Sequence, residues 1–377
     1  MQTFHCTHCQ NLVFFENVRC LKCERALAYI ANRRIMAALQ QGTDGFWRCE
    51  LDGETAQPYK LCANYSEQNI CNWAVPADDP KALCFSCRLT RVIPELTQAG
   101  NKEAWYRLEV AKRRMLYTLV TLQLPLEAKI GSETPGLAFE FLKDSIKPNG
   151  DKNRVFTGHD NGLITINLAE ADDVQREKQR LQQNEPYRTL LGHFRHEIGH
   201  YYWDRLIQGS SRLENFRQVF GDERASYEDA LKHHYEYGPP QNWEREYISA
   251  YANMHPWEDW AESWAHFLHM TDALETAGAT GFSLNPNRQD EPSVAFRPES
   301  NSPNRRHFDH MIDQWGALTY AINNFSRGLG LPDNYPFVLS PRVIEKLRFI
   351  WEATRDVANG VQVQVQSFST AQGTNSL

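Results

Sequence analysis

The cysteines constrain the fold of this chain more than any other feature, because all nine lie between residues 6 and 87. Two Cys-x-x-Cys pairs come first, and ten residues separate them. Each such pair supplies two thiolates from a tight turn, so two pairs complete a tetrahedral zinc site. The short apolar run 12–16 between the pairs predicts a hairpin strand. The sequence therefore predicts a zinc ribbon with the ligands Cys6, Cys9, Cys20 and Cys23.

The other five cysteines form a looser group in which four residues would complete a second zinc site. We predict the ligands to be Cys62, Cys71, Cys84 and Cys87, which leaves Cys49 free. The spacing equally allows Cys49 as a ligand, with Cys62 or Cys71 as the residue left over. A site in so small a region folds largely because it binds metal.

Length and charge limit the classes of protein to consider. The 377 residues correspond to roughly two to three domains, and the net charge is −7. Residues 1–95 hold ten Lys/Arg and ten Asp/Glu, so their charge does not favour nucleic acid as a partner. No apolar run approaches the ~18 residues of a membrane span, and the first residues do not resemble a secretory signal. We therefore expect a cytoplasmic protein whose cysteines bind metal.

A second metal-binding pattern is the sequence His196-Glu197-Ile198-Gly199-His200. On a helix, His196 and His200 lie on one face and can hold one ion together. Glu197 follows the first histidine, close enough to take a proton from a water that zinc activates. The alternative is two surface histidines with a glutamate between them.

Two histidines leave a catalytic zinc ion one protein ligand short. The best source of the third ligand is the segment 255–266, which carries Glu258 and Glu262 one helical turn apart. Apolar side chains surround this pair, so the predicted helix is largely buried, and buried carboxylates need a metal or another partner. The apolar residues are Trp257, Trp260, Trp264, Phe267 and Leu268.

Hydrophobic periodicity predicts the remaining elements. An amphipathic helix is expected over 102–123, with a basic stripe at 112–114, and a strand is expected over 163–168. Further helices are expected over 186–207, with Pro186 near the first turn, and over 255–275, 307–327 and 341–357. Residues 282–305 have the composition of a loop, and the tail 358–377 that of a disordered segment.

Several stretches together resemble a family of bacterial zinc-binding metallopeptidases, which have an N-terminal zinc ribbon and a zincin-like domain. The stretches are VRCLKC (18–23), LCANYSEQNICNWAV (61–75), LCFSCRL (83–89), AKRRMLYTL (111–119), HEIGHYYWDRL (196–206), HPWEDWAESWAHFLH (255–269) and VIEKLRFI (343–350). The resemblance implies an α+β fold, mainly helical. The corresponding units are zinc ribbon 1–25, a second cysteine-rich region 26–95, catalytic domain 96–280, a C-terminal helical extension 281–357 that packs on the catalytic domain, and tail 358–377.

The acidic pair also resembles the gluzincin pattern, which implies that Glu258 is the third ligand and that Glu262 accepts a hydrogen bond from a ligand imidazole. The reverse assignment stays open. Tyr251 lies seven residues before Glu258. In zincins like anthrax lethal factor, a tyrosine at this offset stabilises the oxyanion, and a packed tyrosine is the alternative. By the same analogy, strand 163–168 would be the edge strand that binds substrate.

The sequence thus predicts a zinc-dependent peptidase that cleaves a peptide or protein, with one catalytic and two structural zinc ions. The ribbons would dock a substrate or a protein partner. The alternative is a zinc-ribbon interaction module with a catalytically silent zincin domain. A third interpretation, a purely structural zinc site, needs a fourth protein ligand such as His193 or His255.

Overall fold

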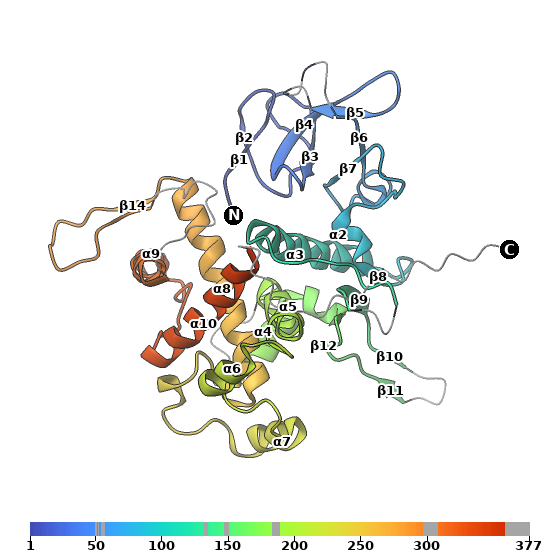
Figure 1. Ribbon diagram of the computed structural model, residues 1–377. Coiled ribbons are helices and arrows are strands. Elements are labelled where there is room, and N and C mark those ends of the chain that lie inside the picture. The colour runs from blue at the N-terminus through green and yellow to red at the C-terminus, as the bar shows by residue number, and fades with distance from the viewer. Residues whose placement is uncertain are drawn as a thin grey trace.

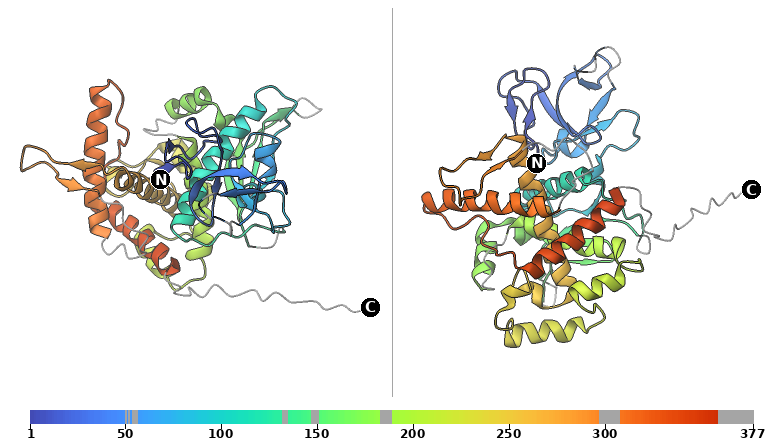
Figure 2. Two further views of the ribbon diagram at one scale, coloured as in Figure 1. Left: turned by 90° about the horizontal axis from the view of Figure 1, so that it is seen from above. Right: turned by 60° about the vertical axis from the view of Figure 1, so that its left-hand side comes forward.

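A computed structural model describes residues 1–49, 51, 53, 57–131, 135–146, 151–182, 189–296 and 308–358. The chain has an α+β fold in which a cysteine-rich, β-strand part lies on one side of helix α3 and a mainly helical part on the other (Figure 1). Figure 2 shows the same two parts from two further directions. Pro186 and the tail beyond residue 358 lie outside the described residues.

The cysteine-rich part contains two antiparallel sheets. The first is a hairpin of β1 and β2, which lie on either side of the turn that holds Cys6 and Cys9. The strand expected over 12–16 is therefore shorter than predicted. The second sheet has five strands in the order β3-β4-β5-β6-β7. The elements are β1 (Phe4–His5), β2 (Leu12–Val13), β3 (Ala26–Ile30), β4 (Ile35–Gln41), β5 (Trp47–Cys49), β6 (Tyr59–Leu61), α1 (Ala63–Ser66), β7 (Ala74–Pro76) and α2 (Phe85–Arg88).

A four-stranded mixed sheet in the order β12-β13-β9-β8 joins the two parts. Its strands are β8 (Thr90–Val92), β9 (Ala138–Leu142), β12 (Gly158–Asp160) and β13 (Leu163–Asn167). Strand β8 follows Cys87 by three residues and pairs in parallel with β9. The strand predicted over 163–168 is present as β13, but it lies between β12 and β9. The edge strands are β12 and β8, so the analogy that made 163–168 the edge was wrong.

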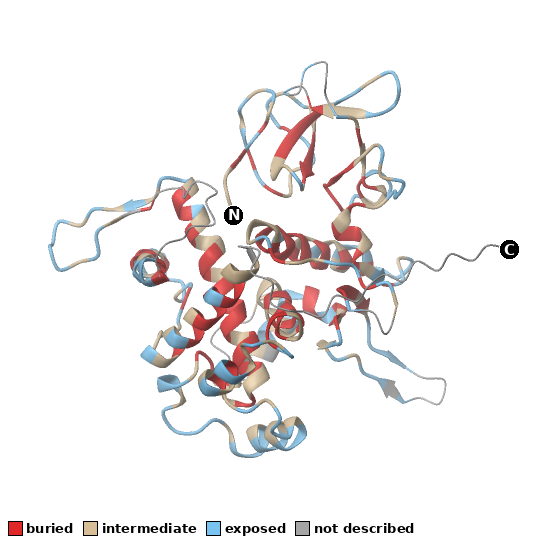
Figure 3. Ribbon diagram, in the orientation of Figure 1, coloured by how far each residue is buried: buried red, intermediate tan, exposed pale blue. Residues whose placement is uncertain are grey.

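Three long helices form the centre of the molecule: α3 (Asn101–Thr121), α5 (Leu190–Leu206) and α8 (Pro256–Ala279). Figure 3 shows that buried residues are concentrated on these helices. The basic stripe expected on α3 is not a solvated face. Lys112 and Arg113 are buried, and the ammonium of Lys112 lies 2.9 Å from the carboxylate of the equally buried Glu109. Only Arg114 is exposed, and it pairs with Glu16.

The remaining elements surround this centre. The helix predicted over 307–327 is α9, and the one predicted over 341–357 is α10. The segment 282–305 was expected to be a loop, but it contains a short hairpin of β14 and β15, and residues 297–305 lie outside the described residues. The elements are β10 (Ser145–Ile146), β11 (Lys152–Asn153), η2 (Leu168–Ala171), α4 (Asp173–Gln182), α6 (Leu213–Phe220), α7 (Tyr227–Tyr237), η3 (Trp243–Arg245), η4 (Tyr251–Asn253), β14 (Ser283–Leu284), β15 (Val294–Ala295), α9 (Phe308–Gly328) and α10 (Pro341–Ala358).

Helices α5 and α8 approach each other most closely at Gly199. A Cβ atom at this position would lie 3.0 Å from the Cα of Ala261 and 3.2 Å from the Cβ of Trp264. The indole N–H of Trp260 donates a 2.8 Å hydrogen bond to the Gly199 carbonyl oxygen, and the rings of Tyr202 and Trp264 stack beside it. Glycine is therefore needed at 199 for close packing.

No helix in the described ranges is both long and apolar enough to cross a lipid bilayer.

Gly199→Ala should destabilise the protein by about 1–3 kcal/mol, because the added methyl group overpacks the contact between α5 and α8. Gly316→Ala is the matched control, since an added Cβ on this exposed residue of α9 meets nothing within 4 Å. That change should stabilise the protein by about 0.5–1 kcal/mol, because alanine loses less backbone entropy in a helix. Urea unfolding in excess zinc measures both. Equal effects of the two changes would contradict the packing argument.

Candidate metal centres

Helices α5 and α8 bring together the three residues expected to hold a catalytic ion. The side chains of His196, His200 and Glu258 each offer one ligand atom, and these atoms lie within 4.8 Å of one another. The Nε2 atoms of the two histidines are 3.3 Å apart. Glu258 places Oε2 at 3.0 Å from Nε2 of His196 and Oε1 at 3.6 Å from Nε2 of His200. The three side chains therefore converge on one point.

Glu262 fixes the orientation of the first histidine. Its Oε1 lies 2.7 Å from Nδ1 of His196, and its Oε2 accepts a 2.6 Å hydrogen bond from the hydroxyl of Ser249. Burial raises the pKa of the Glu262 carboxyl, but the hydrogen bond and charge of His196, together with His266 and the Ser249 hydroxyl, outweigh burial and bring the pKa to about 2. An ionised Glu262 accepts the Nδ1 proton, so the lone pair on Nε2 of His196 faces His200 and Glu258.

The donor set fits zinc. With bonds of about 2.0–2.1 Å, ligand atoms at the corners of a zinc tetrahedron lie roughly 3.3–3.4 Å apart. The 3.0 Å between Nε2 of His196 and Oε2 of Glu258 and the 3.3 Å between the two Nε2 atoms lie near this value, and the other carboxylate oxygen, Oε1, is 3.6 Å from Nε2 of His200. Without a cation, the lone pair of His196 would face the carboxylate oxygen of a glutamate that is only 3% exposed. Buried electron-rich atoms in such contact need a positive charge between them.

Glu197 lies on α5 directly after His196 and is buried. Burial raises the pKa of its carboxyl, and the nearby Glu258 raises it further, while His196 and His200 lower it. A carboxylate with a raised pKa is a stronger proton acceptor than one in water.

Two tyrosines border the glutamate ligand. Tyr251, which the sequence singled out, lies beside His196 with a ring-centroid separation of 6.1 Å. Tyr227 is closer to the metal-ligand set, because its hydroxyl donates a 2.9 Å hydrogen bond to Oε1 of Glu258. Sequence reasoning missed Tyr227. It precedes Glu258 by 31 residues, and no local pattern distinguishes it among 15 tyrosines.

The other histidines considered near this site have different partners. Nδ1 of His193 lies 2.8 Å from Oε2 of the buried Glu170. His255 caps the N-terminus of α8, where its Nδ1 accepts the N–H of Trp257, and its Nε2 lies 3.1 Å from the carbonyl oxygen of Ala225. Neither histidine belongs to the group that converges with His196, so the fourth ligand of a closed structural site does not come from them.

The edge strand β12 lies beside the same centre. The ring of His159 stacks on the ring of His200, with centroids 6.1 Å apart. Burial lowers the pKa of His159 to about 3, and its Nε2 accepts the backbone N–H of Gly162 at 2.8 Å. One turn beyond His200, burial raises the pKa of Asp204 to about 6. The face of β12 that carries His159 therefore lies against His200.

The first four-cysteine group has the geometry of a ribbon site. The Sγ atoms of Cys6 and Cys23 are 3.6 Å apart, as are those of Cys9 and Cys20. With Zn–S bonds of about 2.3 Å, a tetrahedron requires separations of roughly 3.8 Å. Each pair is followed by a residue with positive φ, Gln10 at 58° and Glu24 at 60°. The backbone N–H of this residue donates a hydrogen bond to the carbonyl oxygen of the first cysteine of its pair. These turns point both thiols of a pair the same way.

The second group brings together the four residues that we selected: Cys62, Cys71, Cys84 and Cys87. Cys71 and Cys84 have Sγ atoms 3.7 Å apart. Backbone N–H groups donate to these sulfurs, from Trp73 to Cys71 and from Cys84 to Cys62. Cys49 is buried elsewhere, at the end of β5, with its Sγ 3.7 Å from the hydroxyl of Thr7.

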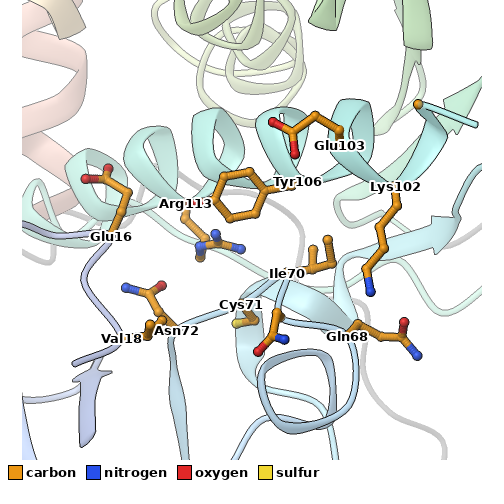
Figure 4. A pocket seen from close by; sticks show the side chains of 12 residues that line it. Glu16, Val18, Gln68, Ile70, Cys71, Asn72, Lys102, Glu103, Tyr106 and Arg113 are labelled. Atoms are coloured by element: carbon orange, nitrogen blue, oxygen red, sulfur yellow. The ribbon is translucent and has the colours of Figure 1, made fainter. Parts of the chain in front are cut away.

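The second group adjoins helix α3. A cavity of about 610 Å³ separates α3 from residues 68–72, and both Cys71 and Arg113 line it (Figure 4). Burial lowers the pKa of Arg113, but the neighbouring thiolates of Cys71, Cys87 and Cys84 and the carboxylate of Glu109 raise it above its ordinary value. The guanidinium therefore offsets part of the negative charge of a zinc tetrathiolate.

Comparison with known proteins agrees with this arrangement. Residues 101–353 match the model of the family described as "Putative zinc-binding metallo-peptidase", and residues 3–98 match that of a zinc-ribbon domain. The first match covers more than half of the chain. The chain therefore belongs to this metallopeptidase family, whose members act on peptides or proteins.

The curated relatives include uncharacterized proteins of Mycobacterium bovis and of two strains of Mycobacterium tuberculosis. Each is 41% identical over 359 residues, which cover 95% of this chain and 96% of the relative. No solved structure matches the chain significantly.

Native mass spectrometry of the purified protein should count three zinc ions per chain, two in four-cysteine sites and one held by two histidines and a glutamate. Cys84→Ser should lower the count by one and reduce the soluble yield, because metal binding contributes folding free energy. Cys49→Ser should keep all three. If Cys49→Ser loses a zinc ion, our choice of ligands in the second group is wrong.

Proposed function

We propose that this chain is a zinc-dependent peptidase with a zincin-like, gluzincin-type catalytic site. The convergence of His196, His200 and Glu258, with Glu197 beside them, carries the proposal. Three protein ligands leave a fourth position for water or substrate, as catalytic zinc sites require. The engagement of His193 and His255 elsewhere supports an open rather than a closed site.

The chemistry follows from the ligand set. Zinc in this position supplies a Lewis acid that polarises a peptide carbonyl and lowers the pKa of water to about 7. Glu197 accepts a proton from the attacking water and returns it to the leaving amine as the C–N bond breaks. The phenol of Tyr251 donates a hydrogen bond to the oxyanion that forms on the carbonyl oxygen. Glu262 holds His196 with Nε2 directed at the metal.

The alternative is a zinc-ribbon interaction module with a silent zincin domain. It predicts that the chain binds a protein partner and hydrolyses nothing. A buried glutamate with a raised pKa at position 197 favours the enzyme, because a silent domain has no need of a carboxylate there.

Glu197→Gln should leave three zinc ions bound but lower peptide hydrolysis by roughly a hundredfold or more, because the change keeps the size of the side chain and removes the general base. Cleavage of a proteome-derived peptide library, read by mass spectrometry, measures activity on many peptide sequences at once. Glu228→Gln, on the exposed side of α7, is the matched control and should match the parent. If the parent cleaves no peptide while it holds three zinc ions, the interaction module becomes the better description.

Glu258→Gln should lower zinc affinity and activity together, because it weakens a direct bond to the metal. Glu262→Gln can still accept the Nδ1–H of His196 through its amide oxygen and loses only charge. It should cost roughly ten- to a hundredfold in zinc affinity or activity at most. If Glu258→Gln retains zinc and Glu262→Gln loses it, then Glu262 is the metal ligand and Glu258 is not.

A further inference from the structure

Tyr227 contacts the metal-ligand set directly, although it belongs to neither of the two metal-binding motifs. It is the first residue of α7, and its hydroxyl donates to Oε1 of Glu258 at 2.9 Å. The other oxygen of the same carboxylate, Oε2, lies 3.0 Å from Nε2 of His196. Oε1 therefore lies between the hydroxyl of Tyr227 and Nε2 of His200, which is 3.6 Å away, whereas Oε2 faces His196.

The backbone around Tyr227 is tied to the helix that carries Glu258. His255 caps α8, and its Nε2 lies 3.1 Å from the carbonyl oxygen of Ala225, two residues before Tyr227. The Tyr227 ring also packs edge-on against the His255 ring, with centroids 5.3 Å apart. At the start of α7, Ser226 accepts the N–H of Asp229. These contacts hold the phenol in place independently of its own hydroxyl, so removal of that hydroxyl should leave the ring where it is.

Tyr227 also contacts the proposed oxyanion donor. Burial raises the pKa of both Tyr227 and Tyr251, and each hydroxyl also affects the pKa of the other, which indicates that the two hydroxyls are neighbours. A phenol has one proton to give, and Tyr227 gives it to Glu258. The hydroxyl of Tyr227 therefore has only its oxygen lone pairs to offer to Tyr251. In this arrangement, Tyr251 can transfer its hydrogen bond to an oxyanion once substrate is bound.

We propose that Tyr227 is a positioning residue that holds Glu258 to one metal-binding oxygen, Oε2, and aligns Tyr251 at the same centre. This inference rests on the proposed function and adds a residue to its site. A hydrogen bond to one oxygen of a ligating carboxylate orients that carboxylate, and loss of such a bond typically lowers metal affinity ten- to a hundredfold. Helix α7 thereby becomes part of the metal centre.

The way α7 is held supports this role. None of its residues is fully buried, and its half-buried residues recur on one face, at Tyr227, Ala230, Leu231 and His234. His234 lies on that face with its ring 5.8 Å from the ring of Tyr251. This face of α7 therefore lies toward the metal centre.

The test compares Tyr227→Phe with Tyr235→Phe, a matched change on the same helix at a residue that is 67% exposed. The zinc count per chain is followed by native mass spectrometry while a chelator is titrated. His196→Ala should lack the zinc ion held by His196, His200 and Glu258. The zinc-release step that the parent shows and His196→Ala does not is therefore assigned to this site. Tyr227→Phe should release this zinc at a roughly ten- to a hundredfold lower chelator concentration than the parent. Tyr235→Phe should release it where the parent does.

Tyr251→Phe separates positioning from catalysis. Among the described contacts, its hydroxyl makes no hydrogen bond to a metal ligand, so the variant should keep the zinc affinity of the parent and lose turnover, with kcat reduced more than KM is changed. The double variant should bind zinc as weakly as Tyr227→Phe alone.

Unchanged zinc release from a folded Tyr227→Phe protein would overturn the role of Tyr227 and leave the proposed peptidase intact. A parent in which no zinc-release step depends on His196 would overturn both. If Tyr227→Phe loses its fold by circular dichroism, the hydroxyl is needed for more than positioning a ligand, and the proposal fails in that form. Amide exchange across 227–237 is the structural control, because α7 should exchange at the parent rate in both Tyr227→Phe and Tyr235→Phe if the ring of Tyr227 stays in place.

Discussion

The candidate active site depends on the close contact between α5 and α8. Gly199 lies against Ala261, and these residues stand between the positions that matter chemically on each helix: His196 and His200 on α5, and Glu258 and Glu262 on α8. A larger residue at 199 would push the helices apart and lengthen the separations between Glu258 and the two histidines. The same few residues thus set both the packing of the core and the geometry of the metal centre.

Burial accounts for the electrostatics of this centre. The carboxylates of Glu197 and Glu258 lie in the interior, where an unpaired charge is costly. Two histidines and a tyrosine hydroxyl contact the Glu258 carboxylate and offset part of the cost of burying its charge. A bound cation would offset the rest. Glu197 lacks the tyrosine contact, and its pKa is raised instead. Two glutamates a few ångströms from the same histidines are therefore prepared for different roles, one to hold a metal and one to move a proton.

Much of this site could be predicted from the sequence, because helical spacing converts directly into geometry. Residues four apart lie on one face, which placed His196 with His200 and Glu258 with Glu262. Cys-x-x-Cys turns likewise selected six of the eight cysteines that the structure groups together, although their metal-binding role stays a prediction, whereas spacing did not exclude Cys49 in place of Cys62 or Cys71. Tyr227 could not be predicted, because its contact with Glu258 depends on how the connection between α5 and α8 folds back. The buried Lys112 was also missed, since its partner Glu109 neutralises it only once α3 is packed.

Strand β8 has a consequence for how the chain is made. It follows the last cysteine by three residues, yet it completes its hydrogen bonds only with β9, which lies more than forty residues further along the chain. During synthesis, the ribbon region emerges first and can bind zinc, but its final strand remains without a sheet until β9 has been made. The newly made N-terminal part therefore carries an unpaired strand for a time, and unpaired strands are prone to join other chains. A cell short of zinc would lengthen that interval, so we expect metal supply to govern how much of the protein is recovered in the folded state.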